Sequence, residues 1–563
     1  MRKTSFLFAV IIFFSFSINT NAQTLPVGMQ GLEDFYRRAQ LLGQIDSSVS
    51  FTVRPLIPYN AFKLKDGFYP DSTETRYNLL DATGSGSTKD GKLKWQLLPL
   101  TFLSQVNTHH PYGWNDGSML PAKGLQTLIS AGVFAEYGPL TIQFRPEVVL
   151  AANSSFDTFD KDHYDIIVAR YYDFYNNIDL PARFGSSGLT KLYWGQSSIR
   201  LNYKALSFGL STENLWWGPG MRNSLLMSNT APGFAHFTLN TRKPIQSPVG
   251  SFEGQIIAGR LENSGYGVLQ PEREYFNQPL FVPKRDSWRY LSGIMITWQP
   301  KWVPGLFLGL SRSAQLYGAD LSSFSDYLPF SGSRSQSIAS QPINGKDKRN
   351  SYFMRWLWPE EHAEIYFEYG RNNYNGNGSD LSLEANSSRA YIFGVRKLFP
   401  FGSRKEEHLM LSAEVTQMQE PNEKNVLNLN SWYASKTIRQ GYTNRGEVLG
   451  AGIGPGGNLQ SIDISWVKGL KRLGLQFERL VHNNDLYYYL FNDSKDFRRH
   501  WTDLSIGAIG EWNYKNFIFS GKLQGIQSLN YQWFLFQAPG EPYMVPGKDV
   551  FNLQIQAGIS YRF

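Results

Sequence analysis

A pair of tryptophans beside a glycine-proline turn is the first feature of this sequence that could bind a ligand. Trp216 and Trp217 stand in ENLWWGPGMRNSLLMSNTAPGF, which runs from Glu213 to Phe234. Neighbouring side chains of an extended segment point to opposite sides, so one indole can stack on a sugar ring while the other anchors the backbone. The alternative is a packed corner, which the turn at Gly218-Pro219-Gly220 favours.

Basic side chains accompany this stretch. Arg222, Arg242 and Arg260 could each bind the carboxylate of a uronate or pyruvyl group through the planar guanidinium. They could also pair with carboxylates of the protein itself, and the two uses are compatible. The acidic residues available for such pairs are Glu213, Glu253 and Glu262.

Amide and hydroxyl side chains lie in the same stretch. Asn223, Ser228 and Asn229 supply neutral donors and acceptors for sugar hydroxyls. Because any polar loop contains such residues, they add to a sugar-binding hypothesis without deciding it.

Two segments contain residue types that bind metals. HHPYGWNDG places His109 and His110 side by side, but neighbouring residues of a strand diverge and do not converge on one ion. DTFDKDHYD, residues 157–165, is acidic, but it lacks the glycine turn and terminal glutamate of a calcium loop. We therefore expect a solvated acidic loop at 157–165, no bound metal in either segment and no cofactor.

Motifs of the common enzyme classes are absent from the sequence. It has no cysteine, no G-x-S-x-G, no H-E-x-x-H and no phosphate-binding loop. Glycosidic cleavage needs two carboxylates about 5 to 10 Å apart, which Glu213 with Glu253 or Glu262 could supply. A Ser-His hydrolase stays open as well, since its residues need not be adjacent. We expect a protein that is not an enzyme.

The N-terminus has the pattern of a secretory signal peptide. Arg2 and Lys3 precede an apolar run from Phe6 to Ile18, which is shorter than the roughly 20 residues of a spanning helix. We expect cleavage before Gln23, so the protein is exported.

The composition is compatible with a transmembrane β-barrel. Mean hydropathy is −0.35, but a barrel strand turns only alternate side chains toward lipid, so a low average does not exclude one. The 31 Tyr, 39 Phe and 15 Trp suit the aromatic girdles of such barrels. The net charge of +8 is dispersed, which argues against nucleic-acid binding and suits an anionic polymer, an anionic lipid or an ordinary surface.

The last segment, VFNLQIQAGISYRF, shows the clearest strand pattern. Its odd-numbered residues from Phe551 to Phe563 are apolar or aromatic, and the even-numbered ones between them are polar or glycine. This alternation predicts a strand with one face toward lipid and one toward a polar lumen, although a soluble sandwich also alternates. The aromatic end, with Tyr561 before Phe563, resembles the signal that outer-membrane barrels present to their insertion machinery.

Similar strands recur upstream and are joined by short turns. Long polar loops, such as residues 371–380, alternate with these turns, which is typical of outer-membrane barrels. We predict an all-β fold, a transmembrane antiparallel β-barrel. The expected turns are Gly138-Pro139, Lys204-Ala205, Pro359-Glu360-Glu361, Gly402-Ser403, Gly469-Leu470 and Lys515-Asn516.

One segment has helical spacing instead. Between Met29 and Ile45, apolar residues recur on one face and charged residues on the other. We expect a short helix that caps the periplasmic end of the barrel, either by packing on its rim or by plugging the lumen. The expected organisation is a signal peptide at 1–22, an N-terminal helical periplasmic segment at 23–60 and the barrel at 61–563.

Three blocks of this sequence resemble the Wzi family of outer-membrane capsule-assembly proteins, in its Bacteroidetes-type branch. The most specific is residues 211–266, which begins STENLWWGPGMRNSLL. The others are HHPYGWNDGSMLPAKGLQ at 109–126 and GYTNRGEVLGAGIGPGGN at 441–458. Together with the signal peptide, the helix and the aromatic end, they extend the resemblance over essentially the mature chain.

The resemblance implies a monomeric barrel of about 18 strands in the outer membrane, closed by a periplasmic helical bundle. It also implies a lectin that binds capsular polysaccharide or exopolysaccharide and anchors it at the cell surface. The expected partners are that polymer, outer-membrane lipid and the insertion machinery, with no nucleic acid. Candidate polysaccharide-binding residues are Trp216, Trp217, Arg222, Asn223, Asn229, Arg242, Arg260, Glu262, Trp114, Asn115 and Asp116.

Two other functions remain open at this stage. A porin or transport channel would use the same charged lumen to select solutes. An outer-membrane hydrolase would need a catalytic set assembled from distant residues.

Overall fold

The computed structural model describes most of the chain. The described residues are 23–29, 31–62, 67–70, 84–330, 345–372, 389–402, 406–420, 431–491, 500–534 and 549–563. The expected signal peptide at 1–22 lies outside them.

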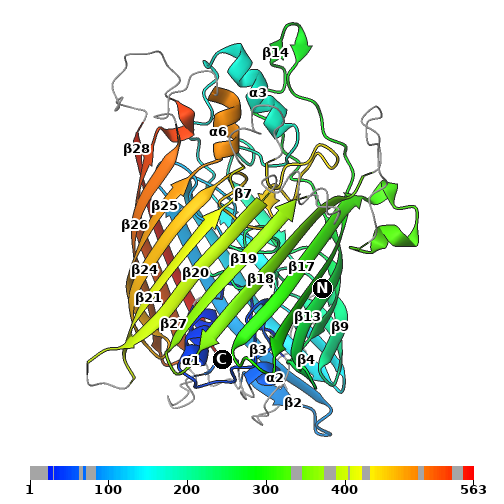
Figure 1. The fold of residues 1–563 in the computed structure, drawn as a ribbon, viewed down its shortest axis with the longest axis vertical. Coiled ribbons are helices and arrows are strands. Elements are labelled where there is room, and N and C mark those ends of the chain that lie inside the picture. The colour runs from blue at the N-terminus through cyan, green and yellow to red at the C-terminus, as the bar shows by residue number, and fades with distance from the viewer. Residues whose placement is uncertain are drawn as a thin grey trace, which may run out of the picture.

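The chain forms a closed antiparallel β-barrel of 18 strand positions in the described part (Figure 1). Some positions consist of two short strands in succession, because the chain bends within the barrel wall. The strands of the wall are β2 (Ser85–Ser87), β3 (Leu93–Asn107), β4 (Gly124–Tyr137), β5 (Leu140–Phe144), β6 (Glu147–Ala151), β7 (Leu189–Tyr193), β8 (Ser198–Tyr203), β9 (Leu206–Ser211), β11 (His236–Thr241), β12 (Ile245–Ser247), β13 (Gly250–Leu261), β16 (Arg289–Pro300), β17 (Leu306–Tyr317), β18 (Asp347–Trp358), β19 (Ala363–Asn372), β20 (Arg389–Pro400), β21 (His408–Gln417), β24 (Asn458–Lys468), β25 (Lys471–Val481), β26 (Thr502–Tyr514), β27 (Phe517–Leu529) and β28 (Val550–Tyr561). Strand β28 pairs with β3 and closes the barrel.

Other elements lie inside the barrel or at its ends. The short strands are β1 (Val53–Arg54), β10 (Trp216–Trp217), β14 (Glu274–Tyr275), β15 (Gln278–Pro279), β22 (Thr443–Asn444) and β23 (Glu447–Val448). The helices are α1 (Leu32–Leu41), α2 (Pro58–Phe62), α3 (Asp165–Tyr175) and α6 (Asn484–Phe491), with 3-10 turns η1 (Gly318–Asp320), η2 (Phe324–Tyr327) and η5 (Tyr531–Trp533). None of the helices in the described ranges has the length and apolarity that crossing a membrane requires.

The strands follow the alternation seen in the sequence. In β28, Phe551 and Ile555 are 57% and 42% exposed on the outer face, whereas Asn552 and Gln554 are 0% and 4% exposed and point into the lumen. The polar side chains are buried because the lumen is filled with protein. The predicted apolar exterior and polar interior are confirmed.

Short turns join the strands at one end, as predicted. Two-residue turns need a positive φ in their first residue to match the twist of the strands. Lys204 and Lys515 adopt φ of 51° and 53°, and Gly138 and Gly469 adopt 56° and 54°. The turn at 359–362 is also present. The expected turn at Gly402-Ser403 lies partly outside the described residues.

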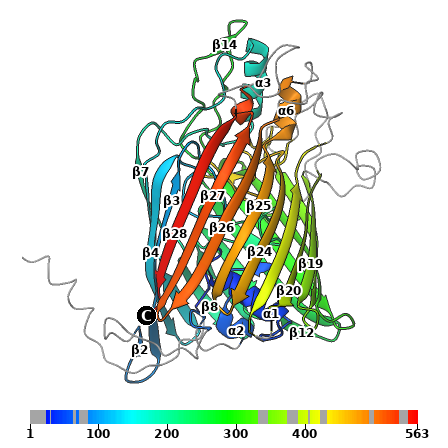
Figure 2. The same cartoon turned by 90° about the vertical axis from the view of Figure 1, so that its left-hand side faces the viewer.

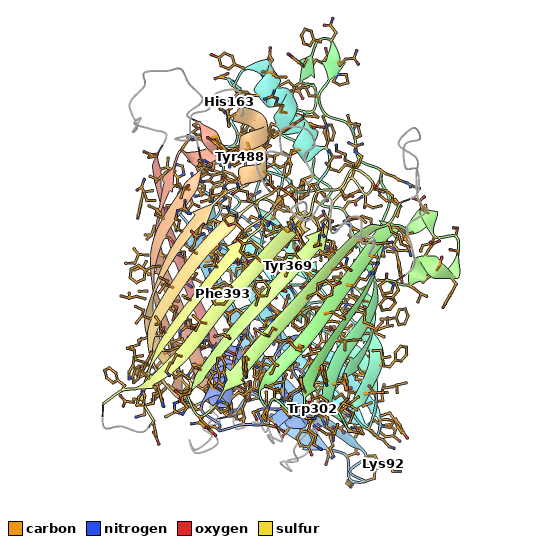
Figure 3. The ribbon with its side chains drawn as sticks, viewed as in Figure 1. Lys92, His163, Trp302, Tyr369, Phe393 and Tyr488 are labelled. Atoms are coloured by element: carbon orange, nitrogen blue, oxygen red, sulfur yellow. The ribbon has the colours of Figure 1, made fainter. Side chains whose placement is uncertain are left out.

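Aromatic side chains form belts on the outer face. Tyr352, Tyr369 and Tyr391 are register partners on neighbouring strands, toward the end that carries the long loops. Figure 3 shows Tyr369 and Phe393 on the wall and Trp302 near the short-turn end. Tryptophans near the short-turn end are Trp298, Trp302, Trp356, Trp358, Trp466 and Trp512. Such belts mark the two interfaces of a transmembrane barrel.

The N-terminal segment lies inside the barrel at the short-turn end (Figures 1 and 2). Helix α1 falls within the predicted range of 29–45, and Leu32 and Tyr36 pack in an apolar cluster with Ile518 of the wall. Its opposite, charged face is also buried, since Arg37 is 2% exposed and pairs with Glu364 of β19 at 2.7 Å. Helix α2 extends across the expected 60/61 boundary, and the first wall strand, β2, begins at Ser85.

At the opposite end, α3 and α6 stand above the barrel with the long loops (Figures 1 and 2). One guanidinium nitrogen of Arg170 in α3 donates to the carbonyls of Tyr489 and Leu490 at 3.1 Å each. The hydroxyl of Tyr489 in α6 donates to Asp173 in α3 at 2.9 Å. These bonds join the two helices into one cap over the lumen.

Candidate functional site

The barrel wall is interrupted where the tryptophan pair occurs. Strands β9 and β11 have only six residues each and pair with each other. The chain between them, residues 212–235, leaves the wall and folds into the lumen. The stretch that the sequence singled out is therefore an internal segment.

Trp216 and Trp217 form strand β10, which pairs with β1 of the N-terminal segment. The indole nitrogen of Trp217 donates to Gln255 at 2.8 Å, and the side chain is fully buried. Trp216 is 3% exposed, and the guanidinium of Arg54 lies 4.4 Å from its ring centroid. The two indoles lie on opposite sides of β10, as expected, and both pack against protein.

Glycine is required in the corner that follows. Gly218 has φ of 113°, a conformation that other residues rarely adopt. A Cβ on Gly220 would lie 1.9 Å from the carbonyl oxygen of Asn223. The predicted rigid corner is confirmed.

The second family-like block packs onto this corner. The indole nitrogen of Trp114 and the amide of Asn115 both donate to the carbonyl of Arg222, at 3.2 and 2.7 Å. The amide of Asn229 donates to the carbonyl of Asn115 at 2.9 Å. Arg222 also lies over the ring of Trp114, 4.8 Å from its centroid.

The third block completes the internal structure. The backbone of Ser228 donates to the Leu449 carbonyl at 2.8 Å, and the amide of Asn444 donates to the Pro232 carbonyl at 2.9 Å. Segments 109–122, 212–235 and 431–457 thus form one body, which we call the lumenal plug. Three blocks that are far apart in the sequence are brought together here.

Carboxylates of the wall hold the plug in place. Glu414 of β21 accepts from the backbone of Met221, Arg222 and Asn223 at 2.7, 3.0 and 2.9 Å. Arg222 pairs with Glu478 of β25 at 2.7 Å. Burial alone would lower the pKa of Arg222, but Glu478 reverses this and raises it. The guanidinium therefore stays charged.

Three candidate residues lie outside the plug. Arg260 and Glu262 form a pair at 2.7 Å near the long-loop end, with Arg260 over the ring of Trp288. Arg242 follows β11 at the short-turn end, where its backbone donates to Ala205 at 2.7 Å. Arg222 and Arg260 thus pair with acidic residues, one of the two uses expected from the sequence.

The histidine pair lies against the cap. The Nδ1 atoms of His109 and His110 are 3.1 Å apart, and the ring centroid of Tyr531 lies 4.5 Å from that of His110. Burial lowers the pKa of His110 to about 4, so this imidazole is neutral at pH 7. Among the described residues, no group of three or more His, Cys, Asp or Glu could hold a metal ion.

A cavity of 350 Å³ lies between the plug and the N-terminal segment. Trp114 and Trp216 contribute to its lining. Its charged lining residues are Glu33, Asp34, Arg37, Arg54, Asp116, Arg145, Glu147, Arg222, Glu511 and Lys522, with equal numbers of each sign. The cavity therefore has no strong preference for one charge.

A second hollow, of 440 Å³, opens beside α3 at the long-loop end. We call it the aromatic hollow. It is lined by Phe156, Asp157, Thr158, Phe159, Asp160, Lys161, Val168, Tyr171, Tyr172, Tyr175, Leu180, Ala182, Val268, Leu269, Gln270, Arg273 and Phe534.

Stacked rings shape the aromatic hollow. Phe159 and Tyr171 stack with centroids 4.0 Å apart, and Tyr175 lies 4.4 Å from Tyr171. Arg273 donates to the Lys161 carbonyl at 2.7 Å and fixes the rim. Ring faces beside polar groups are suited to a ligand that has both C–H faces and hydroxyls.

The aromatic hollow was not predicted from the sequence. Residues 157–165 have the composition of a polar loop, and no helix was predicted after them. The available signal was the helical spacing of Val168, Tyr171, Tyr172 and Tyr175. The partner segment at 268–273 is about 100 residues away and carries no comparable signal.

The sequence also matches a family model. Residues 123–508 match the model described as capsule assembly protein Wzi.

The chain belongs to the Wzi family.

One solved structure shares the fold of this chain. It is Wzi of Escherichia coli, an outer-membrane protein involved in group 1 capsule assembly and described as a carbohydrate-binding β-barrel. It has 13% identity and a TM-score of 0.58, and the match covers 96% of this chain and 100% of that one. OccAB4 of Acinetobacter baumannii has 12% identity and a TM-score of 0.38, covering 86% and 99%. No match was found among curated protein sequences.

Family and fold together place this Wzi-family protein in the outer membrane. The long-loop end with α3 and α6 is then extracellular, and the short-turn end with α1 is periplasmic. The aromatic hollow is on the extracellular side, and the plug lies within the membrane-spanning barrel.

Proposed function

We propose that this protein is a lectin-like barrel that binds exported capsular polysaccharide or exopolysaccharide and anchors it at the cell surface. It does so without chemistry on the polymer. The aromatic hollow carries the proposal, because it is an extracellular surface of this chain that combines ring faces with hydroxyl-binding groups. Membership of a capsule-assembly family and the carbohydrate binding of the Escherichia coli relative support it.

In this proposal the polymer lies across the extracellular cap. The half-buried Tyr171 and Tyr175 present aromatic surface to sugar rings, while Lys161 and Arg273 at the rim bind hydroxyl or carboxylate groups. Each contact is weak. A polymer with many repeats is held by several such contacts at once, so avidity sets its retention.

The plug residues take a supporting part in this proposal. Trp216, Trp217, Asn223 and Asn229 are buried by protein contacts, and they support the extracellular segments from below. Direct contact of the polymer with these residues, or with Trp114, Asn115 and Asp116, stays a prediction. It would require the plug to open toward the cap.

A channel is the main alternative, and the packing of the lumen opposes it. Trp217 of the plug, Met295 of the wall and Trp432 belong to one buried apolar cluster that fills the barrel interior. On the periplasmic side, Arg37 of α1 donates to the Pro219 carbonyl of the plug at 2.8 Å. A solute would have to break both layers to cross.

Other assignments rest on the sequence alone. We propose a monomer of the Bacteroidetes-type branch that the barrel insertion machinery assembles into the outer membrane. Outer-membrane lipid is the expected surrounding partner, and nucleic acid is not. The identity of the sugars is a matter for measurement.

The test is binding of the purified full-length protein to polysaccharide from its own cells. We expect saturable binding, and we expect Tyr171→Ala to weaken it about fivefold, since one lost aromatic contact costs about 1 kcal/mol. Phe276→Ala is the matched control, because Phe276 is an aromatic residue of the same cap, 81% exposed and outside the hollow.

Heat-dependent gel mobility reports whether each variant is a folded barrel. Equal weakening by both substitutions would locate binding elsewhere on the cap. No binding by the wild type would reject the proposal.

A further inference from the structure

A groove runs along the outer face of the wall, on strands β24 to β28, which face the viewer in Figure 2. It consists of two adjoining hollows of 560 and 490 Å³. Gln460 of β24 and Arg479 of β25 line both of them. The groove is on the lipid side of the wall and is separate from the plug and the aromatic hollow.

The lower hollow is apolar. Ile462, Phe477, Ile506 and Phe551 line it, and each is between 41% and 57% exposed. Gly525 provides the depression, because its register partner on β26 is Ile506 and it has no side chain of its own. A Cβ at this position would lie 3.3 Å from the ring of Phe551. This hollow has the shape and polarity to take a hydrocarbon chain.

Arg479 lies at the upper edge of the apolar hollow. It is exposed on the outer face, and its guanidinium donates to Gln460 at 2.9 Å. Its register partner on β26 is Leu504, which pairs in turn with Gln527 of β27. Polar and apolar side chains therefore alternate at this level, above the wholly apolar row of Ile462, Phe477 and Ile506. An outward arginine costs little at the interface and much at the midplane. Its position marks the level of the lipid headgroups.

The upper hollow is more polar than the lower one, although Val481 and Leu529 also line it. Gln417, Asn484 and Thr502 line it together with Arg479. Amide and hydroxyl groups of this kind bind sugar hydroxyls. From bottom to top, the groove therefore offers a site for an acyl chain and then, at one level, an arginine beside amide and hydroxyl groups. A phosphorylated glycolipid of the lipid A type fits this arrangement, because its acyl chains extend from the sugar rings into the membrane and its phosphates are attached to the same rings.

We propose that this groove is a specific site for a phosphorylated glycolipid of the outer leaflet. One acyl chain lies over Gly525, the phosphate pairs with Arg479 and the sugar contacts Gln417 and Thr502. The charge of Arg479 at the edge of an apolar hollow selects this ligand over a neutral lipid. Such a lipid would fix the barrel in the leaflet on which capsule accumulates.

The test measures lipid A binding to the full-length protein in detergent by native mass spectrometry. Two substitutions remove different parts of the site. Arg479→Gln removes the charge, and Gly525→Leu fills the acyl depression without changing any charge. We expect each to weaken binding at least fivefold. Dephosphorylated lipid A should bind the wild type as weakly as phosphorylated lipid A binds Arg479→Gln.

Arg312→Gln is the matched control, because Arg312 is another arginine on the outer face of the wall and does not line the groove. It lies on the same face of β17 as Leu310, which is 40% exposed. We expect this variant to bind within twofold of the wild type. The proposal is overturned if Arg479→Gln or Gly525→Leu also binds within twofold of the wild type. The proposal is also overturned if Arg312→Gln loses as much lipid A binding as Arg479→Gln. Any positive charge on the outer face would then attract the lipid equally well. Heat-dependent gel mobility confirms that each variant is folded.

Discussion

At the scale of single residues, the two tryptophans have different packing. Trp217 has no exposure and a hydrogen bond to the wall, whereas Trp216 lines the internal cavity under Arg54. The sequence alone suggested that one indole would anchor the corner, but it did not say which. The choice depends on β1, whose pairing with β10 joins residues more than 160 positions apart.

Trp217→Ala should destabilise the folded protein by about 3 to 5 kcal/mol, because a large buried side chain leaves a cavity. Heat-dependent gel mobility measures the change, because the folded band should convert to the unfolded band at a lower temperature. Trp302→Ala is the control, since Trp302 is 68% exposed on the outer face. A Trp217→Ala protein of normal stability that fails to bind polysaccharide would show that this ring contacts sugar.

Asp116 predicts a pH dependence of the plug. Burial raises its pKa to about 7 from the usual 3.8, although hydrogen bonds from its own backbone and from Gln105 oppose this. The folded protein then holds a proton that the unfolded chain releases above about pH 4, so its stability falls as the pH rises from about 4 to 7. Above about pH 7, Asp116 is ionised in both states and the stability no longer changes with its titration.

The thermal unfolding temperature of the purified protein, measured at pH 5 and pH 8, tests this expectation. The wild type should lose more stability between these values than Asp116→Asn, which cannot ionise. Equal losses in the two proteins would show that Asp116 does not control the pH response.

At the scale of elements, helix α1 depends on buried ion pairs. Glu364 of β19 lies between Arg37 and Arg355, at 2.7 and 2.6 Å, with all three side chains almost fully buried. Arg37 also contacts the plug through Pro219. The helix is thus a link between the wall and the plug as well as a periplasmic cap.

Arg37→Met should weaken the docking of α1 by about 1.5 to 3 kcal/mol, because Glu364 loses one of its two buried cationic partners and the Pro219 carbonyl loses a charged donor. Faster hydrogen exchange in residues 32–41 reports this. Lys397→Met is the matched control, since the pair of Lys397 with Glu361 at 3.2 Å is largely exposed and contributes about 0 to 1 kcal/mol. Unchanged exchange in Arg37→Met would mean that apolar packing alone holds the helix.

Much of the barrel could be predicted because strand alternation and short turns are local patterns. The turns at 204–205, 469–470 and 515–516 and the polarity of β28 follow from neighbouring residues. The strand number came from family resemblance, since alternation does not say where a wall position contains two short strands. The plug could not be predicted, because a polar segment that folds inward resembles an external loop in sequence.

The buried charge of α1 shows a related limit. Its amphipathic spacing predicted an apolar face and an opposite charged face. In the structure both faces are buried, because the lumen is lined with complementary charges. Arg37 is 2% exposed for this reason. Hydrophobic periodicity identifies the helix, whereas its surroundings decide what the polar face contacts.

At the scale of the whole molecule, the barrel has a filled interior. Single-channel recording of the purified protein in a planar bilayer should show no large steady conductance, because the plug and the N-terminal segment obstruct the path in two layers. A large and stable conductance would favour the channel. It would count against a lectin whose lumenal plug only supports the extracellular segments.

The central claim is that the protein holds polysaccharide at the cell surface, and one measurement tests it most directly. The cell-bound and released fractions of polysaccharide are compared in cells with and without the gene. Without the gene, polymer should move from the cell-bound fraction to the medium while the total stays the same, and the wild-type gene should restore attachment. Polymer that stays attached in cells without the protein would contradict the account.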